Sequence, residues 1–137
     1  MKKLVIHSRV SEAHQAQQTI MKEAAAHRFT NDAGFAIRLA LDEALSNAIH
    51  HGNRDDPHKH ITIDYQITDE RVRICVCDEG AGFNPDAVPD PTLDENLERP
   101  HGRGVMLMRA YMTQVIFNDR GNCVTLVKRR NCPLPRR

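Results

Sequence analysis

The chain has 137 residues and a formal net charge of +1, a length that fits one compact domain spanning residues 1–137. Because the net charge is so small, there is no electrostatic reason to expect direct binding to nucleic acid or to an anionic membrane. The chain has no apolar run long enough to cross a bilayer and no signal-peptide pattern, so we expect a cytoplasmic protein.

The chain is expected to begin with a short strand and a helix. Residues 4–6 are apolar and predict the strand. Ser11 is suited to cap the following helix, which would run to about His27 or Arg28. Apolar residues recur along it at helical spacing, so one face of this helix should pack on a core.

A second helix is expected to be the most deeply buried. Thr30 or Asn31 would cap its start, and Gly52 is suited to the C′ position that ends it. Residues 35–49 are apolar over most of the helical circumference, which is typical of a buried helix. The few polar side chains on it therefore need partners or a function.

Two-residue alternation replaces the helical pattern after the second helix. Residues 61–67 and 72–76 alternate apolar and polar side chains on either side of a turn, which predicts an antiparallel hairpin. Residues 84–100 show no periodicity and contain four prolines. A loop this long in a small domain is usually either a functional lid or a disordered segment.

The last part of the chain predicts a helix and a second hairpin. Residues 105–111 are mostly apolar, and residues 115–117 and 124–127 flank a turn. The expected fold class is therefore an α+β two-layer sandwich: a mixed, mostly antiparallel sheet covered on one face by helices.

Glu43 and Asn47 form the first candidate site pair. They lie four residues apart on the buried helix, so their side chains are neighbours, and His51 follows one turn later on the same face. Such a pair can simply satisfy its own hydrogen bonds. It can also hold Mg²⁺ through the Asn47 carbonyl oxygen, while Glu43 takes a proton from an attacking hydroxyl or water.

Residues 78–83 form the second candidate segment, in which Asp78 ends a strand and is followed by Gly80 and Gly82. Glycine lets a backbone approach a ligand closely. A carboxylate at this position can accept a hydrogen bond from the exocyclic amino group of adenine, which would favour adenine over guanine. The alternative is an acidic turn without a ligand.

Gly102, Arg103 and Gly104 form the third candidate segment, directly before the helix that begins at Val105. A glycine-flanked helix N-terminus binds anions through free N–H groups, and Arg103 can add charge-assisted bonds to a phosphate. The alternative is a hinge of the lid. The segment is neither a Walker A loop nor a dinucleotide fingerprint.

The four cysteines and the histidines are not expected to form metal or disulfide sites. Cys75 and Cys77 point the same way along one strand, where neighbouring positions make poor disulfide partners, and they lack zinc-site spacing. Together with Cys123 and Cys132, they are expected to be reduced thiols that act as small apolar residues.

The three segments together resemble the GHKL superfamily of ATP-binding domains, which has the Bergerat fold. Residues 43–52 resemble its N box, residues 78–83 its first glycine box and residues 102–104 its second, within a match over residues 35–128. The chain looks most like the bacterial anti-sigma factor serine/threonine kinases, through residues 47–53 and 82–85.

This resemblance implies ATP and Mg²⁺ as cofactors, with Glu43 as the base that activates a protein serine. It implies Asn47 as the Mg²⁺ ligand and Asp78 as the adenine reader. The candidate ATP-binding residues are Asn47, His51, Asp78, Gly80, Gly82, Phe83, Gly102, Arg103, Gly104 and Val105. Arg103 is included for its charge and not because of the resemblance. It further implies a homodimer that holds a sigma factor inactive and phosphorylates a STAS-type anti-anti-sigma protein, thereby regulating transcription.

Three other functions remain open at this point. The same motifs would serve an ATP-gated binding module that performs no phosphate transfer. They would also serve a detached histidine-kinase ATP-binding domain, whose phospho-accepting module would then lie on another chain. In the last alternative, the glycines are only turns of a soluble α/β domain.

Overall fold

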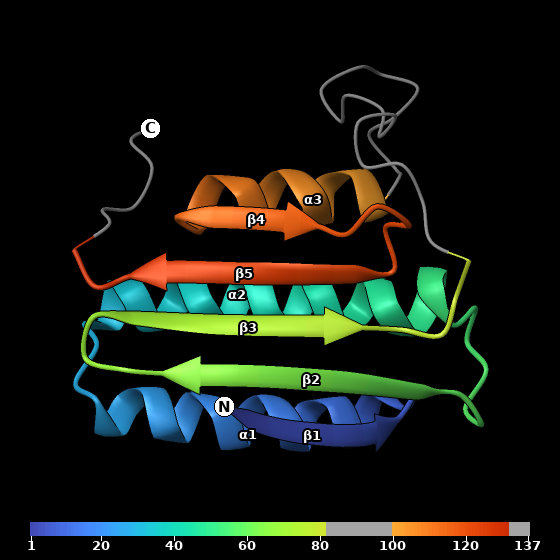
Figure 1. Cartoon of the computed structure of the whole chain (residues 1–137), viewed down its shortest axis with the longest axis horizontal. Coiled ribbons are helices and arrows are strands. Elements are labelled where there is room, and N and C mark those ends of the chain that lie inside the picture. Colours follow the sequence, from blue (N-terminus) through green and yellow to red (C-terminus); the bar gives the residue numbers. More distant parts are fainter. Residues whose placement is uncertain (82–99, 132–137) are drawn as a thin grey trace.

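A computed structural model describes residues 1–81 and 100–131, with only the backbone described for residues 100–103. A five-stranded sheet lies in front of the helices in Figure 1. The strands are β1 Lys2–His7, β2 His60–Ile67, β3 Arg71–Cys77, β4 Gln114–Phe117 and β5 Cys123–Arg129. The helices are α1 Val10–Ala26, α2 Asn31–Asn47 and α3 Pro100–Tyr111, with a π-helical turn, η1 Ala48–Gly52, directly after α2.

The strand order β1-β2-β3-β5-β4 confirms the predicted two-layer α+β arrangement. All four neighbouring strand pairs are antiparallel. A parallel pairing, which a mixed sheet requires, does not occur among the described strands. The helices cover one face of the sheet, and no described helix covers the other face, which is called the open face below (Figure 1).

The core lies between the sheet and the helices. Alternate residues of β2 and β3 point into it, as the two-residue periodicity predicted, and Ile61, Ile63, Val72 and Ile74 are fully buried. Burying each such side chain contributes about 1.5–3 kcal/mol relative to leaving it exposed. Most buried apolar residues of the described part form one cluster; that all 137 residues make a single domain stays a prediction.

The ends of α1 and α2 differ in part from the predicted ends. The Thr30 side chain accepts a hydrogen bond from the Ala33 amide at 3.1 Å, which confirms Thr30 as the cap of α2. Ser11 is not a cap, because α1 already begins at Val10. Gly52 is not a left-handed C′ residue either. It lies inside η1, where the Asn53 amide bonds the Ala48 carbonyl at 2.8 Å.

Helix α3 begins earlier than the sequence predicted. It starts at Pro100 rather than Val105, so residues 102–104 are helical and do not form a turn. Proline is well tolerated in the first turn of a helix. Val105 and Met108 are buried in the core, and this packing offsets the low helix propensity of the glycines.

Helix α3 packs against α2 and runs antiparallel to it. At the C-terminal end of α3, the Tyr111 ring meets the Phe35 ring edge-on at 5.8 Å, near the start of α2. The Tyr111 carbonyl also accepts a hydrogen bond from the fully buried Lys128 ammonium at 2.7 Å. These contacts fix the C-terminal end of α3. Because the helix is a rigid element, they also help to position its N-terminal end.

The cysteine prediction was wrong for two residues. Cys77 of β3 and Cys123 of β5 form a disulfide. They face each other directly in the antiparallel register, which brings their side chains together. Cys75 is a free thiol, as predicted, and Cys132 lies outside the described residues.

Arg130 is expected to be a strong contributor to stability. Its guanidinium lies 4.3 Å from the centre of the Phe29 ring and donates hydrogen bonds to the carbonyls of His27, Arg28 and Asp69. It therefore ties the α1–α2 connection to the β2–β3 turn. Arg130→Ala should lower the free energy of unfolding by roughly 1.5–3 kcal/mol, as measured by urea denaturation.

The matched control is the neighbouring Arg129, whose side chain is exposed. Arg129→Ala should change stability by no more than about 0.5 kcal/mol. Equal losses in the two variants would contradict the role given to Arg130.

Candidate active site

Gly104 of α3 lies directly on Glu43 and Asn47 of α2. A Cβ atom added to Gly104 would come within 2.9 Å of Glu43 Oε2 and 3.1 Å of Asn47 Nδ2. Only glycine lets the helix backbone approach these two side chains so closely. The first and third candidate segments therefore meet, at the C-terminal end of α2 and the N-terminal part of α3.

The second segment joins them through η1. A Cβ atom on Gly52 would collide with the Asp78 carboxylate, and a Cβ atom on Gly80 would collide with the Gly52 carbonyl oxygen. The turn that follows β3 thus packs against the π-helical turn that extends α2. The C-terminal end of α2, the N-terminal end of α3 and the end of β3 lie at the same side of the molecule (Figure 1).

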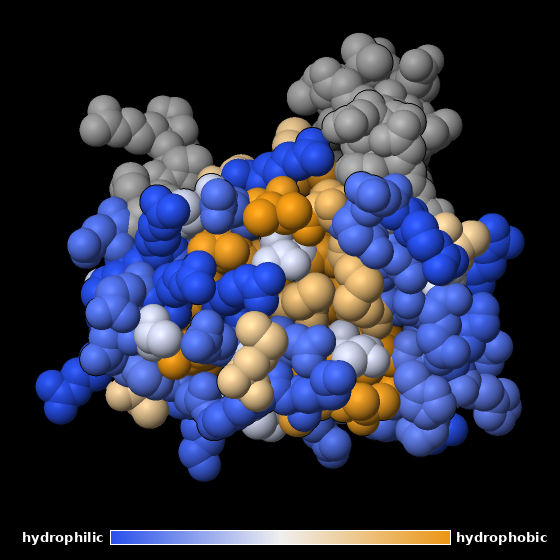
Figure 2. Space-filling model, in the orientation of Figure 1, coloured by the Kyte–Doolittle hydropathy of each residue, from blue (hydrophilic) through white to orange (hydrophobic). Residues whose placement is uncertain are grey.

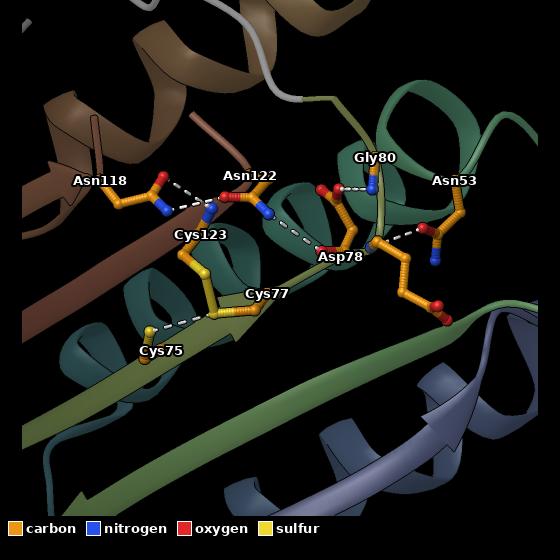
Figure 3. Close-up of a disulfide and its surroundings, with 9 residues drawn as sticks. Asn53, Cys75, Cys77, Asp78, Gly80, Asn118, Asn122 and Cys123 are labelled. Carbon is orange, nitrogen blue, oxygen red and sulfur yellow. Dashed lines mark hydrogen bonds between the residues drawn. A yellow bond between two sulfur atoms is a disulfide. The ribbon is translucent and has the colours of Figure 1, made fainter. Parts of the chain in front are cut away.

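Backbone and side-chain hydrogen bonds hold Asp78 in place. Its carboxylate accepts a bond from the Gly80 amide at 2.7 Å. Its own amide donates to the Asn122 carbonyl at 2.9 Å, and the Asn122 side chain donates to the Asp78 carbonyl at 3.3 Å (Figure 3). These bonds with Asn122 fix the Asp78 backbone to the start of β5. They do not use the Asp78 carboxylate, which can therefore also accept a hydrogen bond from a ligand.

Asn53 is a site-forming residue to which the sequence analysis gave no role. It is fully buried, its side chain accepts from the Glu79 amide at 2.8 Å, and it donates to the His60 carbonyl at 3.1 Å. It thereby fixes the segment after η1 to the Asp78 turn. A buried asparagine directly after a helix end is a signal for such a role, because it must find partners for its amide.

Burial changes the protonation of the two candidate carboxylates. It raises the pKa of Glu43 above its usual value, and the negative charge of Asp42 adds to the rise. Burial also raises the pKa of Asp78, although the Gly80 amide and the charge of Lys59 oppose the change. Both groups hold a proton more readily than ordinary carboxylates, and Glu43 is therefore suited to accept one.

The raised pKa of Glu43 gives a stability prediction with a definite sign. The folded state binds the Glu43 proton more tightly than the unfolded state does, so this group lowers stability as pH rises through its folded pKa. Glu43→Gln removes that effect. The variant should unfold at a higher urea concentration than the wild type at pH 7, and the gain should disappear at pH 4.

Glu12 provides the opposite control. The hydrogen bond from the His7 amide lowers the pKa of Glu12, so its charged form favours the folded state. Glu12→Gln should therefore not stabilise the protein at pH 7. A Glu43→Gln variant that is less stable than the wild type at pH 7 would contradict the effect assigned to burial.

The remaining predicted site residues are exposed, buried or outside the described residues. His51 is exposed and lies in η1, four residues after Asn47, and its contact with ATP stays a prediction. Val105 is buried in the core, so its side chain packs inside the protein. Gly82 and Phe83 lie outside the described residues, and residues 102 and 103 are described only by their helical backbone.

Other features of the described part bear on binding. Among the described residues, no three His, Cys, Asp or Glu side chains gather in a way that would hold a metal ion on their own. A groove of about 660 Å³ lies between α1 and α2, lined by residues such as Gln17, Met21 and Phe35, away from Asp78 and Gly104. None of the described helices is long and apolar enough to cross a membrane.

Comparison with known proteins gives a family match over most of the chain. Residues 6–128 match the model of the histidine kinase-like ATPase domain. The sequence is 29% identical to the serine-protein kinase RsbW of Bacillus subtilis, over 75% of this chain and 69% of that protein. It is 36% identical to the anti-sigma F factor of Geobacillus stearothermophilus, over 72% of this chain and 68% of that protein.

A solved structure shows the same fold. The crystal structure of the RsbU and RsbW domains of Rv1364c from Mycobacterium tuberculosis superposes with a TM-score of 0.59 over 98% of this chain, at 15% sequence identity. The match covers 34% of that longer chain. At this identity, the likeness concerns the arrangement of helices and strands alone.

Proposed function

This chain belongs to the family of histidine kinase-like ATPase domains, with anti-sigma factors and serine-protein kinases among its relatives, and we propose that it is an anti-sigma factor with protein serine/threonine kinase activity. It would transfer the γ-phosphate of ATP to a hydroxyl of a STAS-type anti-anti-sigma protein. It would also bind a sigma factor and hold it inactive. The observation that carries the proposal is the contact of Gly104 with Glu43 and Asn47, next to the Asp78 turn.

Each side chain has a chemical task in this proposal. Glu43 accepts the proton of the attacking serine or threonine hydroxyl, which general-base catalysis makes a better nucleophile. Asp78 accepts a hydrogen bond from the exocyclic amino group of adenine and thereby selects ATP over GTP. The amide oxygen of Asn47 is a hard ligand that suits Mg²⁺, which would neutralise phosphate charge when bound.

The N-terminal part of α3 is assigned to the phosphates. The first amides of a helix have no partner inside it, and the helix dipole is positive at this end. Since α3 begins at Pro100, only a few residues before Gly104, these amides lie close to the Glu43–Asn47 pair. Arg103 is proposed to add a charge-assisted bond to the phosphate tail.

Other parts of the proposal rest on family resemblance. They are a homodimer, ATP contacts by Gly82 and Phe83, and a cytoplasmic location. A dimer is tested by the mass of the purified protein in solution.

A labelling experiment tests the function. The protein would be incubated with Mg²⁺ and γ-labelled ATP, alone and with candidate anti-anti-sigma proteins. We expect label on the partner that survives acid, as phosphoserine and phosphothreonine do. A nucleotide-dependent complex without label would instead indicate an ATP-gated binding module, and acid-labile label would indicate phosphohistidine; either outcome would overturn the proposed activity.

A further inference from the structure

Three sulfur atoms gather on the open face of the sheet. Cys77 and Cys123 form the disulfide, and Cys75 Sγ lies 3.8 Å from Cys77 Sγ (Figure 3). The alternate positions Ile74 and Val76 point into the core, so Cys75 and Cys77 face away from the helices. Both are only partly buried, on a face where apolar side chains are visible among polar ones (Figure 2).

This sulfur cluster is continuous with the proposed nucleotide site. Cys77 immediately precedes Asp78, and Cys123 immediately follows Asn122. Asp78 and Asn122 are already joined by two hydrogen bonds, of 2.9 and 3.3 Å. The disulfide adds a covalent link between the same two strand ends, so it restricts the backbone from which the Asp78 carboxylate projects.

We propose that Cys75, Cys77 and Cys123 form a thiol–disulfide exchange site for small thiols of the glutathione class, and that its redox state sets how firmly the Asp78 turn is held. Where a compartment is kept reducing, a protein disulfide is typically transient and responsive to redox conditions. A third thiol next to a disulfide also allows exchange within the protein, because exchange proceeds by attack of a thiolate on a disulfide sulfur.

The external reaction is balanced by two glutathione molecules. The first thiolate attacks one sulfur of the Cys77–Cys123 bond, which forms a mixed disulfide and releases the other cysteine as a thiolate that takes up a proton. The second attacks the mixed disulfide and releases oxidised glutathione. The protein disulfide gains two electrons and two protons, and the two glutathione thiols lose them; oxidised glutathione drives the reverse reaction.

Cys75 provides a second route to reduction of the Cys77–Cys123 disulfide, which begins within the protein. Its thiolate attacks Cys77, the Cys77–Cys123 bond breaks, and Cys123 leaves as a thiolate that is then protonated. Neighbouring positions on one strand suit a disulfide poorly, so the Cys75–Cys77 bond formed in this way is an intermediate that an external thiol opens readily. Cys75 should therefore accelerate reduction of the Cys77–Cys123 disulfide.

The exchange is tested in the full chain carrying Cys132→Ser, so that the fourth cysteine gives no signal. The protein is equilibrated with oxidised or reduced glutathione, alkylated and mapped by mass spectrometry. We expect Cys77 and Cys123 to be protected in oxidised glutathione and labelled in reduced glutathione, and we expect Cys75→Ser to slow the reduction several-fold. Labelling of both cysteines under oxidising conditions, or an unchanged rate in Cys75→Ser, would overturn the assignment.

The link to the nucleotide rests on the proposed function and is tested separately. ATP affinity is measured for the oxidised protein and for the reduced protein, with a several-fold tighter affinity expected in the oxidised form because its turn is held. Equal affinities would overturn the link. Thiol–disulfide exchange without any ATP binding would overturn the proposed function but not the exchange site. ATP binding without thiol–disulfide exchange would overturn the exchange site but not the proposed function.

Discussion

Glu43→Gln is expected to slow phosphate transfer by roughly 10²–10⁴-fold, the usual contribution of a general base. Glutamine keeps the shape of the side chain beneath Gly104 but cannot accept the hydroxyl proton. The carboxylate is not assigned to the adenine or to the phosphates, so ATP affinity should remain nearly unchanged. Single-turnover transfer and equilibrium ATP binding, measured on the same preparation, separate the two effects.

Asp42 provides the matched control for this substitution. It is the adjacent acidic residue of α2, but its environment is formed by Arg38 and by the α1 residues His14 and Gln17. Asp42→Asn should therefore leave transfer within a few-fold of the wild type. A Glu43→Gln variant that transfers phosphate at the wild-type rate would remove Glu43 from the reaction.

Asp78→Asn is expected to weaken ATP binding by roughly 1.5–3 kcal/mol, or about ten- to hundredfold, because a hydrogen bond to a charged acceptor is lost. The asparagine oxygen can still accept the bond from the Gly80 amide, so the turn should keep its conformation. The preference for ATP over GTP should fall together with the affinity. Calorimetric titration with both nucleotides in the presence of Mg²⁺ measures both quantities.

Glu79→Gln is the control for Asp78→Asn. Glu79 is the next residue, but its side chain is exposed and accepts a hydrogen bond from the His60 amide. Its substitution should leave nucleotide affinity unchanged. Wild-type protein that binds ATP and GTP equally well would contradict the role of Asp78 as an adenine reader.

Features set by local interactions were predictable from the sequence. The Thr30 cap depends on a hydrogen bond three residues away, and the β2–β3 hairpin depends on alternation within two adjacent segments. The order of Glu43, Asp78 and Gly104 along the chain also indicated one site, and the structure places the three segments in contact. Their roles in binding and transfer stay predictions.

Features set by distant contacts were not predictable in this way. Residues 102–104 are helical because α3 packs against α2, and that packing overrides the low helix propensity of two glycines. The Cys77–Cys123 disulfide depends on the register between β3 and β5, which are separated in sequence by α3 and β4. The π-helical turn at Ala48–Gly52 left no periodic pattern in the sequence.

The most direct test of the shared nucleotide site is a titration of ¹⁵N-labelled protein with ATP and Mg²⁺, followed by NMR. The amides of Asn47, Asp78 and Gly104 report on the three segments separately. We expect all three to shift along one binding curve with a single dissociation constant. Shifts confined to one segment, or three curves with different dissociation constants, would contradict a single site.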